Sequence, residues 1–287
     1  MIFITGAAGK TGRAIIHALA HGNNQITALV RTSAQAQTLS GYGNLKILIG
    51  DLNNLQIIAS EIPQNATLYH ICPNVSPFEL EIGRQLIRIA QNKKFDRFIY
   101  HSVLHPQVEE MPHHWQKMRV EEELFKSGLD FTILQPCAYM QNILGSWKEI
   151  KTGRYSTPYK VSAKMSLVDL NDVAEAAARV ILDPGYANAI FELAGPDQLD
   201  QNQIARYCSS ALETPVAAVE LSREDWLNNS LSRGMALDQA LVLIKMFEYY
   251  DQYGFVGNPA VLSMLLTHPP THFQQFLERT LSTGEIA

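Results

Sequence analysis

Short apolar runs alternate with amphipathic segments along the first half of the chain. The apolar runs predict strands at Ile2–Thr5, Gln25–Val30, Leu45–Ile49, Thr67–Ile71, Arg97–Ser102 and Phe131–Gln135. The amphipathic segments predict helices at Gly12–His21, Ala34–Leu39, Asn54–Glu61, Glu79–Asn92 and Trp115–Ser127. Buried strands that alternate with helices in this way are typical of a parallel sheet with helices on both faces. The pattern therefore predicts an α/β fold with a doubly wound parallel sheet.

The alternation weakens after Pro136. Residues 151–162 are rich in Gly, Tyr, Ser, Thr and Pro, which predicts loops. Beyond them the pattern predicts strands at Leu167–Asp169 and Ala189–Leu193, a helix at Asn171–Leu182 capped by Asn171, and helices at Gln201–Leu212, Arg223–Ser232, Asp238–Tyr253, Ala260–Leu266 and Thr271–Leu281. We therefore expect a doubly wound domain over residues 1–150, with a return segment near 165–195, and a smaller, mostly helical lobe over residues 151–287.

Composition narrows the class of protein. The 287 residues are 46% hydrophobic and 18% charged, and the net charge of −5 disfavours direct nucleic-acid binding. Cys72, Cys137 and Cys208 lie far apart and form no CxxC motif, so we expect neither a zinc site nor disulfides, and a reducing compartment. The N-terminus lacks the features of a signal peptide, and no apolar stretch is long enough to span a membrane. These features predict a cytoplasmic protein without a membrane or nucleic-acid partner.

The first predicted strand runs into the segment TGAAGKTG, residues 5–12. Gly6 allows a tight turn, Gly9 lets the backbone approach a pyrophosphate, and Gly12 allows the helix to pack closely on the strand. The N-terminus of the following helix favours the anion. A plain strand–helix turn is the alternative, but three glycines at this spacing favour dinucleotide binding. The predicted cofactor contacts in the turn are Gly6, Ala8, Gly9, Lys10, Thr11 and Gly12.

The ends of the second and third strands indicate which dinucleotide is bound. Proteins that prefer NAD place an acidic residue after the second strand to bind the ribose 2′-hydroxyl group. Here Arg31 stands there instead, and its guanidinium suits a 2′-phosphate, so we predict NADP(H), with Lys10 adding positive charge. The alternative is that both cations are solvated surface residues. Asp51, followed by Leu52, can accept a hydrogen bond from the adenine amino group, cap the next helix, or do both.

Several segments together resemble the NmrA-like family of atypical short-chain dehydrogenase/reductase proteins. They are TGAAGKTG, LVRT, GDL, H-x-x-x-K-x-x-x-E from His113 to Glu121, SGLDFTILQP-x-x-Y-x-x-N from Ser127 to Asn142, VDLNDVAEAAARVI, FELAGPDQL and THFQQFL. They extend over nearly the whole chain. The resemblance implies an NADP(H)-preferring Rossmann domain and a small C-terminal lobe that forms a cleft. It also implies one of two activities, reduction of quinone-like substrates or redox sensing without turnover.

Short-chain dehydrogenases generally carry Tyr-x-x-x-Lys on the helix after the fifth strand. The tyrosine protonates the substrate, and the lysine lowers the pKa of the tyrosine and holds the nicotinamide ribose. Here Lys117 is present and His113 takes the place of the tyrosine, one helical turn away on the same face. A histidine of near-neutral pKa, or Lys117 itself, could supply a proton. The alternatives are a solvated Lys117 paired with Glu121, and an orienting or surface role for His113.

Further candidate site residues follow other strand ends. The predicted cofactor contacts there are Cys72, Pro73, Asn74, Ser102, Val103, Pro136 and Tyr139, and the predicted substrate contacts are Tyr139 and Asn142. Cys137 has no identifiable base and is expected to be a buried small residue. Most of the aromatic residues Phe247, Tyr249, Tyr250, Tyr253 and Phe255 are expected to pack in the core or a lid, and one or two of them could stack on a flat substrate.

Three histidines that are near in sequence, His101, His105 and His114, invite a metal hypothesis. No carboxylate or cysteine completes a recognisable ligand spacing with them. We therefore predict no metal.

The most direct functional interpretation is an NADPH-dependent reductase that passes hydride to a quinone or a similar carbonyl or enone compound. The alternative is a non-catalytic NADP(H) sensor that acts through a regulatory protein partner. A sugar-nucleotide epimerase is disfavoured because that chemistry relies on the missing tyrosine. Either main interpretation is compatible with a monomer or a homodimer.

Overall fold

The computed structural model describes residues 1–20, 22 and 24–283, so the end of the predicted helix Gly12–His21 lies outside the described residues. The chain divides into two compact units, which we describe one at a time. Unit 1 consists of Met1–Gln107, His113–Gln135 and Val173–Phe191, and unit 2 of Val108–Pro112, Pro136–Asp172 and Glu192–Ala287. Residues 136–150 thus belong to unit 2, whereas the sequence analysis assigned them to the first domain.

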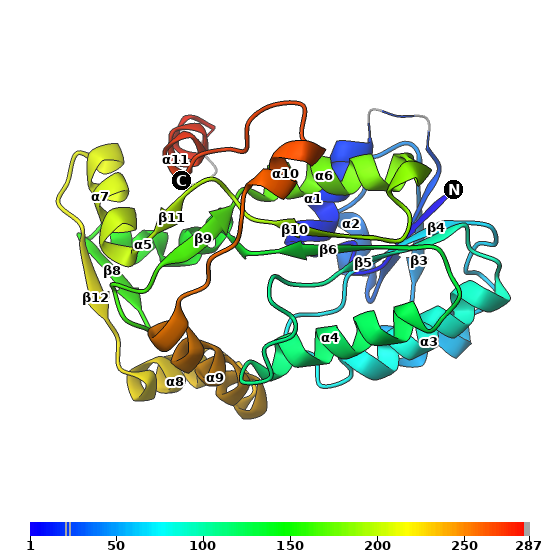
Figure 1. Cartoon of the computed structure of the whole chain (residues 1–287), viewed down its shortest axis with the longest axis horizontal. Coiled ribbons are helices and arrows are strands. Elements are labelled where there is room, and N and C mark those ends of the chain that lie inside the picture. Colours follow the sequence, from blue (N-terminus) through cyan, green and yellow to red (C-terminus); the bar gives the residue numbers. More distant parts are fainter. Residues whose placement is uncertain (21, 23, 284–287) are drawn as a thin grey trace. The chain divides into compact units, whose positions relative to one another are not determined.

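Unit 1 is built on a seven-stranded sheet (Figure 1). Its strands are β1 (Ile2–Ile4), β2 (Ile26–Val30), β3 (Leu45–Ile49), β4 (Thr67–His70), β5 (Arg97–His101), β6 (Phe131–Pro136) and β10 (Ala189–Leu193). The order is β10-β6-β5-β4-β1-β2-β3, and the pairs among β1 to β6 are parallel. The chain order reverses between β1 and β4, and a crevice beyond the carboxyl ends of strands at such a point is where doubly wound sheets bind nucleotides. The predicted fold class is confirmed.

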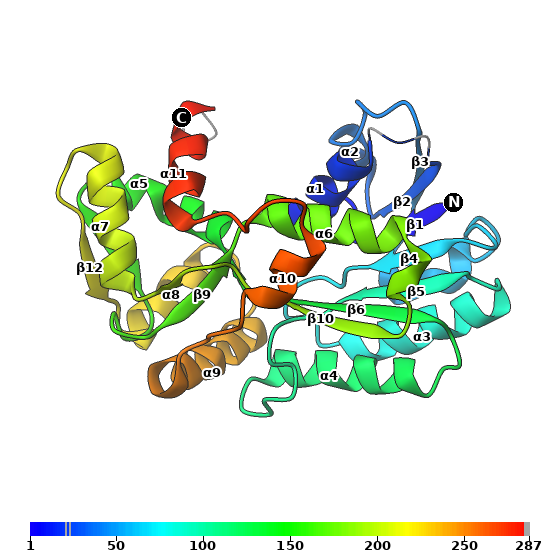
Figure 2. The same cartoon turned by 45° about the horizontal axis from the view of Figure 1, so that its top comes forward.

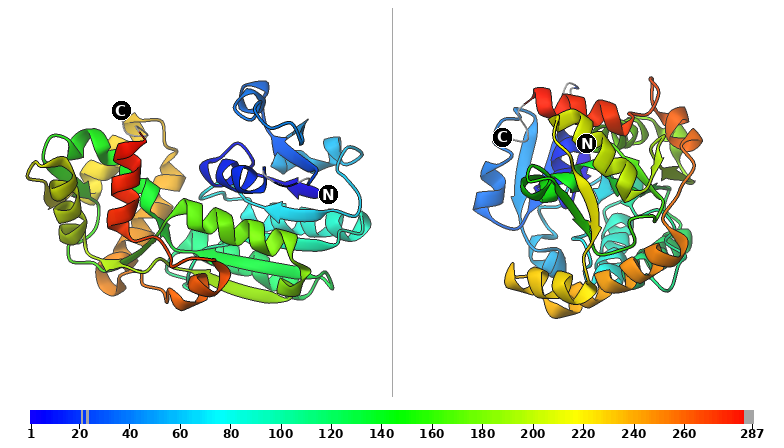
Figure 3. Two further views of the ribbon diagram at one scale, coloured as in Figure 1. Left: turned by 90° about the horizontal axis from the view of Figure 1, so that it is seen from above. Right: turned by 90° about the vertical axis from the view of Figure 1, so that its left-hand side faces the viewer.

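Helices cover both faces of this sheet. The helical segments of unit 1 are α1 (Lys10–Leu19), α2 (Ser33–Gln37), η1 (Leu52–Ile58), α3 (Glu79–Asn92), α4 (Pro112–Phe125), α6 (Leu170–Leu182) and η3 (Pro184–Tyr186). Helices α1 and α6 lie on one face and α3 and α4 on the other (Figures 1 and 3). The core between the sheet and α3 and α4 includes Phe3, Leu86 and Val120, all fully buried. Apolar faces fix the place of α1, α3 and α6 on the sheet, and α4 packs there through the buried side chains of Val120 and Leu124.

Unit 2 contains two small sheets and several helices (Figure 2). Its strands are β7 (Ala138–Tyr139), β8 (Arg154–Thr157), β9 (Met165–Val168), β11 (Gln198–Leu199) and β12 (Ala217–Glu220). Its helical segments are η2 (Met140–Ser146), α5 (Trp147–Ile150), α7 (Gln201–Leu212), α8 (Arg223–Ser232), α9 (Leu237–Tyr253), α10 (Ala260–Leu265) and α11 (Phe273–Ser282). A core that includes Trp147, Ile204 and Phe276 holds them together. Among the residues that the structure describes, no helix has both the length and the apolarity needed to cross a bilayer.

The structure corrects the sequence-based elements at several places. Strand β8 lies within the predicted loops of residues 151–162, because it pairs in parallel with β12. The predicted helix Asn54–Glu61 is instead the 3-10 segment η1, with non-helical backbone at Asn54. Asp169 Oδ1 accepts a hydrogen bond from the Asn171 N–H group (3.0 Å), so Asp169 rather than Asn171 caps α6.

Candidate functional site

The glycine turn joins β1 to α1. Gly6 has a φ of +63°, and a Cβ atom on it would lie 2.7 Å from the carbonyl oxygen of Ile71. A Cβ atom on Gly12 would lie 2.4 Å from the carbonyl oxygen of Gly6, so α1 packs directly on the turn. Gly9 is the exposed N-cap of α1 and provides no side-chain capping hydrogen bond. The fold thus requires glycine at positions 6 and 12, and Gly9 leaves the helix N-terminus open to an anion.

Hydrogen bonds join the carboxyl ends of β1 and β4 beside this turn. The Thr5 N–H group donates to the carbonyl oxygen of Tyr69 (3.0 Å), and the Ile71 N–H group donates to Thr5 Oγ1 (3.1 Å). Thr5 Oγ1 also lies 2.7 Å from His70 Nδ1. These contacts fix the glycine turn relative to the segment after β4, at the point where the strand order reverses.

The residues that follow β2 and β3 are exposed. The Arg31 N–H group donates to Gln35 Oε1 (2.8 Å), and within the described part of the chain the Arg31 guanidinium has no ion-pair partner. It is therefore available to an external anion. Asp51 Oδ1 accepts a hydrogen bond from the Asn53 N–H group (2.9 Å), which confirms the predicted capping role. Contact of Asp51 with adenine remains a prediction.

Lys117 forms a buried ion pair with a residue that the sequence analysis missed. Its Nζ lies 3.0 Å from Glu79 Oε1 and 3.4 Å from the carbonyl oxygen of His101, at the end of β5. The Lys117 and Glu79 side chains are only 11% and 3% exposed. Tyr100 OH donates to the same Glu79 oxygen (2.7 Å), and its ring lies 5.4 Å from Lys117 Nζ. Glu79 is the first residue of α3. From the sequence alone, an acidic residue at this position indicates only a favourable interaction with the helix dipole, so it does not reveal the pairing with Lys117.

The alternative pairing of Lys117 with Glu121 is wrong. Glu121 is buried, and it accepts hydrogen bonds from Ser102 Oγ and from Gln135 Nε2. Burial raises the pKa of the Glu121 carboxyl group. Glu121 therefore connects α4 to the ends of β5 and β6. The hydroxyl group of Ser102, a predicted cofactor contact, already donates a hydrogen bond to Glu121.

His113 lies one turn before Lys117 on α4. Burial, with a smaller contribution from Lys117, lowers the pKa of His113 to about 4. The imidazole is therefore neutral at neutral pH, and the expected near-neutral pKa is wrong. Its Nδ1 is buried and has no hydrogen-bond partner among the described residues. A catalytic role for His113 remains a prediction, and it would have to be that of a neutral imidazole.

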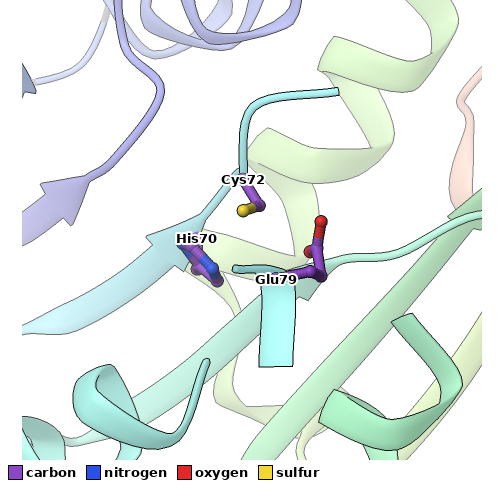
Figure 4. Close-up of side chains that lie close together, drawn as sticks. All are labelled: His70, Cys72 and Glu79. Atoms are coloured by element: carbon purple, nitrogen blue, oxygen red, sulfur yellow. The ribbon is translucent and has the colours of Figure 1, made fainter. Parts of the chain in front are cut away.

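Three side chains other than His101, His105 and His114 lie close enough together to be considered as metal ligands. Figure 4 shows His70, Cys72 and Glu79, whose ligand atoms lie within 4.8 Å of one another; they are the one such group in the described ranges. Burial raises the pKa of the Cys72 thiol, so it stays protonated. Glu79 already binds the Lys117 ammonium group, beside which a divalent cation would be repelled. We therefore assign the group to the polar network around Lys117.

The other predicted site residues are divided between the two units. In unit 1, Cys72 is buried, Val103 is half-buried, and Pro73 and Asn74 are exposed after β4. In unit 2, Tyr139 and Asn142 both line a cavity of about 720 Å³, described below. The predicted contacts of these residues with cofactor and substrate remain predictions.

Two further expectations concern single residues of unit 2. Cys137 is buried, as expected, and burial raises the pKa of its thiol to about 12. Among the aromatic residues of α9, Phe247 lines the same cavity as Tyr139.

The sequence profile of the NmrA-like family matches residues 1–280. The chain belongs to the NmrA-like family. The NAD(P)H azoreductase of Xenophilus azovorans is 25% identical over 279 residues, which cover 96% of each chain. Quinone oxidoreductase 2 of Escherichia coli (strain K12) is 26% identical over 273 residues, which cover 94% of this chain and 95% of the relative.

Solved structures agree with this NmrA-like assignment. The Escherichia coli NADPH-dependent quinone oxidoreductase QOR2, crystallised with NADPH, has a TM-score of 0.85 at 26% identity and covers 98% of this chain and 100% of its own. The negative transcriptional regulator NmrA, crystallised with NAD, shares the fold with a TM-score of 0.79 at 15% identity, over 99% of this chain and 96% of its own. The family resemblance inferred from sequence is thus confirmed.

The buried histidines of this NmrA-like protein predict a loss of stability in acid. Burial lowers the pKa of His70 and of His101 to about 3, from 6.5. In the unfolded chain both histidines bind protons at a higher pH than in the folded protein. Their contribution to the free energy of unfolding is therefore complete above the pKa of the unfolded state and is lost as the pH falls toward the pKa of the folded state. We expect His70→Asn to lessen this fall by about 1 kcal/mol per pH unit between about pH 6 and pH 4, measured by urea unfolding. His17→Asn, at an exposed position of α1, is the control. If the free energy of unfolding fell equally with pH in the unaltered protein and in both variants, the prediction would be contradicted.

Proposed function

We propose that this chain is an NADPH-dependent reductase that passes hydride to a quinone or a similar carbonyl or enone compound. The observation that carries the proposal is Lys117, whose side chain is 11% exposed and is held by Glu79 at the end of β5, in the same unit as the glycine turn. The azoreductase and quinone oxidoreductase relatives, which match nearly the full chain, support it.

The residues around the carboxyl ends of β1 and β2 fit NADP(H). The N-terminus of α1 has Gly9 as its N-cap, without a side chain to occupy the place of a pyrophosphate. The Arg31 guanidinium is exposed and suits a 2′-phosphate, and the segment Arg31-Thr32-Ser33 contains no acidic residue to prefer a free 2′-hydroxyl group. When bound, NADPH supplies the hydride.

Lys117 is proposed to hold the nicotinamide ribose. Glu79 and the carbonyl oxygen of His101 fix its ammonium group in one position, so little side-chain freedom is lost on binding. Neutral His113, one turn before Lys117, is a further polar side chain on that side of α4. A quinone is already electrophilic and needs no strong positioned acid to accept hydride, so the absence of the tyrosine is compatible with this reaction.

The test is to mix the purified protein with NADPH and a panel of quinones and an azo compound, and to follow the absorbance of the reduced nicotinamide. Oxidation that depends on protein and quinone is expected. Tight NADPH binding with no oxidation across the panel would overturn the reductase proposal.

A sensor function is the second candidate. The replacement of tyrosine by His113, whose imidazole is neutral, favours it. A sensor would bind NADPH and NADP⁺ with different affinities and leave both unchanged. Equal affinities for the two forms would argue against a sensor.

The proposed 2′-phosphate contact makes a prediction for cofactor preference. Arg31→Gln is expected to weaken NADPH binding about 30-fold, which corresponds to the loss of roughly 2 kcal/mol from a charge-assisted hydrogen bond, and to leave NADH binding unchanged. Titration calorimetry with both cofactors measures this. Arg119→Gln, at an exposed arginine of α4, is the matched control. An equal loss for NADPH and NADH would refute the role of Arg31.

A further inference from the structure

The cavity of about 720 Å³ is lined entirely by residues of unit 2. Its volume is that of a small-molecule site. The lining is of two kinds, an apolar part rich in aromatic side chains and a polar part that carries the charges. Each part restricts the chemistry of a ligand in a different way.

The aromatic part of the lining favours a flat molecule. The rings of Trp226 and Phe247 lie 4.8 Å apart in an edge-to-face arrangement, and Tyr159 lies 5.8 Å from Phe247. Tyr155 and Phe273 contribute further rings to the same lining. Side chains fixed in this way offer planar apolar surface at little entropic cost, which suits an aromatic ring system.

Gln201 supplies a hydrogen-bond donor that the protein leaves unused. Its side chain is fully buried, and its Oε1 accepts a hydrogen bond from Tyr155 OH at 3.1 Å. Its Nε2 is buried and has no hydrogen-bond partner in the described part of the chain, although both residues line the cavity. An unpaired buried donor destabilises a protein, and a ligand that brings an acceptor removes this penalty.

The charged part of the lining has an excess of positive charge. Its charged residues are Glu149, Arg154 and Arg233. Glu149 is occupied, because Arg154 Nε lies 3.2 Å from its carboxylate and Ser156 Oγ donates to it at 2.6 Å. Arg233 is exposed, and its guanidinium has no ion-pair partner among residues 1–20, 22 and 24–283. It is therefore free to pair with an anionic group.

We propose that this cavity binds a flat aromatic molecule that carries a hydrogen-bond acceptor for Gln201 and an anionic substituent for Arg233. This inference rests on the proposed function in one respect: if the chain is a quinone reductase, its preferred quinones carry a negative charge. The acceptor is then a quinone oxygen.

The test compares two ligands that differ in one substituent, which is anionic in one ligand and neutral in the other. They are a naphthoquinone with a sulfonate group and the same naphthoquinone with a methyl group instead. Titration calorimetry of the whole protein, without cofactor, should give a Kd for the sulfonate about tenfold lower. Arg233→Gln should abolish this preference without changing the affinity for the methyl compound. Gln201→Met should weaken both ligands about tenfold.

Matched controls are available in the same unit. Arg206→Gln and Gln252→Met alter exposed residues outside the cavity and should leave both affinities unchanged. Equal affinities in the unaltered protein, no binding of either compound, or a sulfonate preference that survives Arg233→Gln would overturn the inference. If Gln201→Met does not fold, the result for Arg233→Gln still decides the question, because Arg233 is exposed. If the protein binds the sulfonate preferentially but does not oxidise NADPH, only the proposed function is overturned. If it oxidises NADPH but shows no preference for the sulfonate, only this inference is overturned.

Discussion

Replacing Lys117 with methionine is expected to lower the free energy of unfolding by about 3–5 kcal/mol and NADPH oxidation by about 100-fold. The stability is lost because Glu79, only 3% exposed, loses its cationic partner, and the neutral Tyr100 hydroxyl cannot replace it. The activity is lost because the proposed contact with the nicotinamide ribose is removed. Urea unfolding and an NADPH oxidation assay measure the two effects.

A second variant separates these two effects. The double variant Lys117→Met/Glu79→Gln removes both charges and should recover most of the lost stability but none of the activity. Lys126→Met is the control, because Lys126 forms an exposed pair with Glu122 and should change stability by no more than about 1 kcal/mol. If the single and double variants were equally unstable, the buried ion pair would not be the cause.

Gly12→Ala is expected to destabilise unit 1 by about 3 kcal/mol and to weaken NADPH binding at least about 100-fold. The added Cβ atom would lie 2.4 Å from the carbonyl oxygen of Gly6 and 2.6 Å from Ala7 Cα, both backbone atoms, so α1 must move away from the turn. Thermal unfolding and calorimetric titration with NADPH measure the two effects.

Two other glycines serve as comparisons for this prediction. Gly43→Ala adds a methyl group that meets no described atom within 4 Å, and both properties should be unchanged. Gly9→Ala should weaken cofactor binding with a smaller loss of stability than Gly12→Ala, because its Cβ would meet one described atom within 4 Å, the Gly6 carbonyl oxygen at 3.3 Å. Wild-type NADPH affinity in Gly12→Ala would show that the turn does not hold the cofactor.

Most features that depend on neighbouring residues were predicted from the sequence, with the cap of α6 and the helix Asn54–Glu61 as exceptions. The six parallel strands of the first half follow from their apolar runs, and Asp51 was predicted as a possible helix cap. A strand, a tight turn and a cap are determined by side chains a few residues apart, so hydrophobic periodicity and turn chemistry are sufficient.

Features that join distant parts of the chain were not predicted. Glu79 is 38 residues from Lys117, and only the folded sheet brings α3 and α4 together at the end of β5. The low pKa of His113 comes from burial, which one sequence does not report. Gln201 is 46 residues from Tyr155, so the cavity that they line has no local signal. In each case a tertiary contact decides the chemistry of the side chain.

The assignment of the cavity lining to unit 2 alone has a consequence for how this protein can evolve. Every residue that lines it belongs to unit 2, whereas the glycine turn, Arg31 and the Lys117–Glu79 pair belong to unit 1. Mutations at residues that share no partners act nearly additively. Under the proposed assignments, ligand range and 2′-phosphate preference depend on different residues, so a directed-evolution library confined to the cavity lining is expected to alter the first and leave the second unchanged.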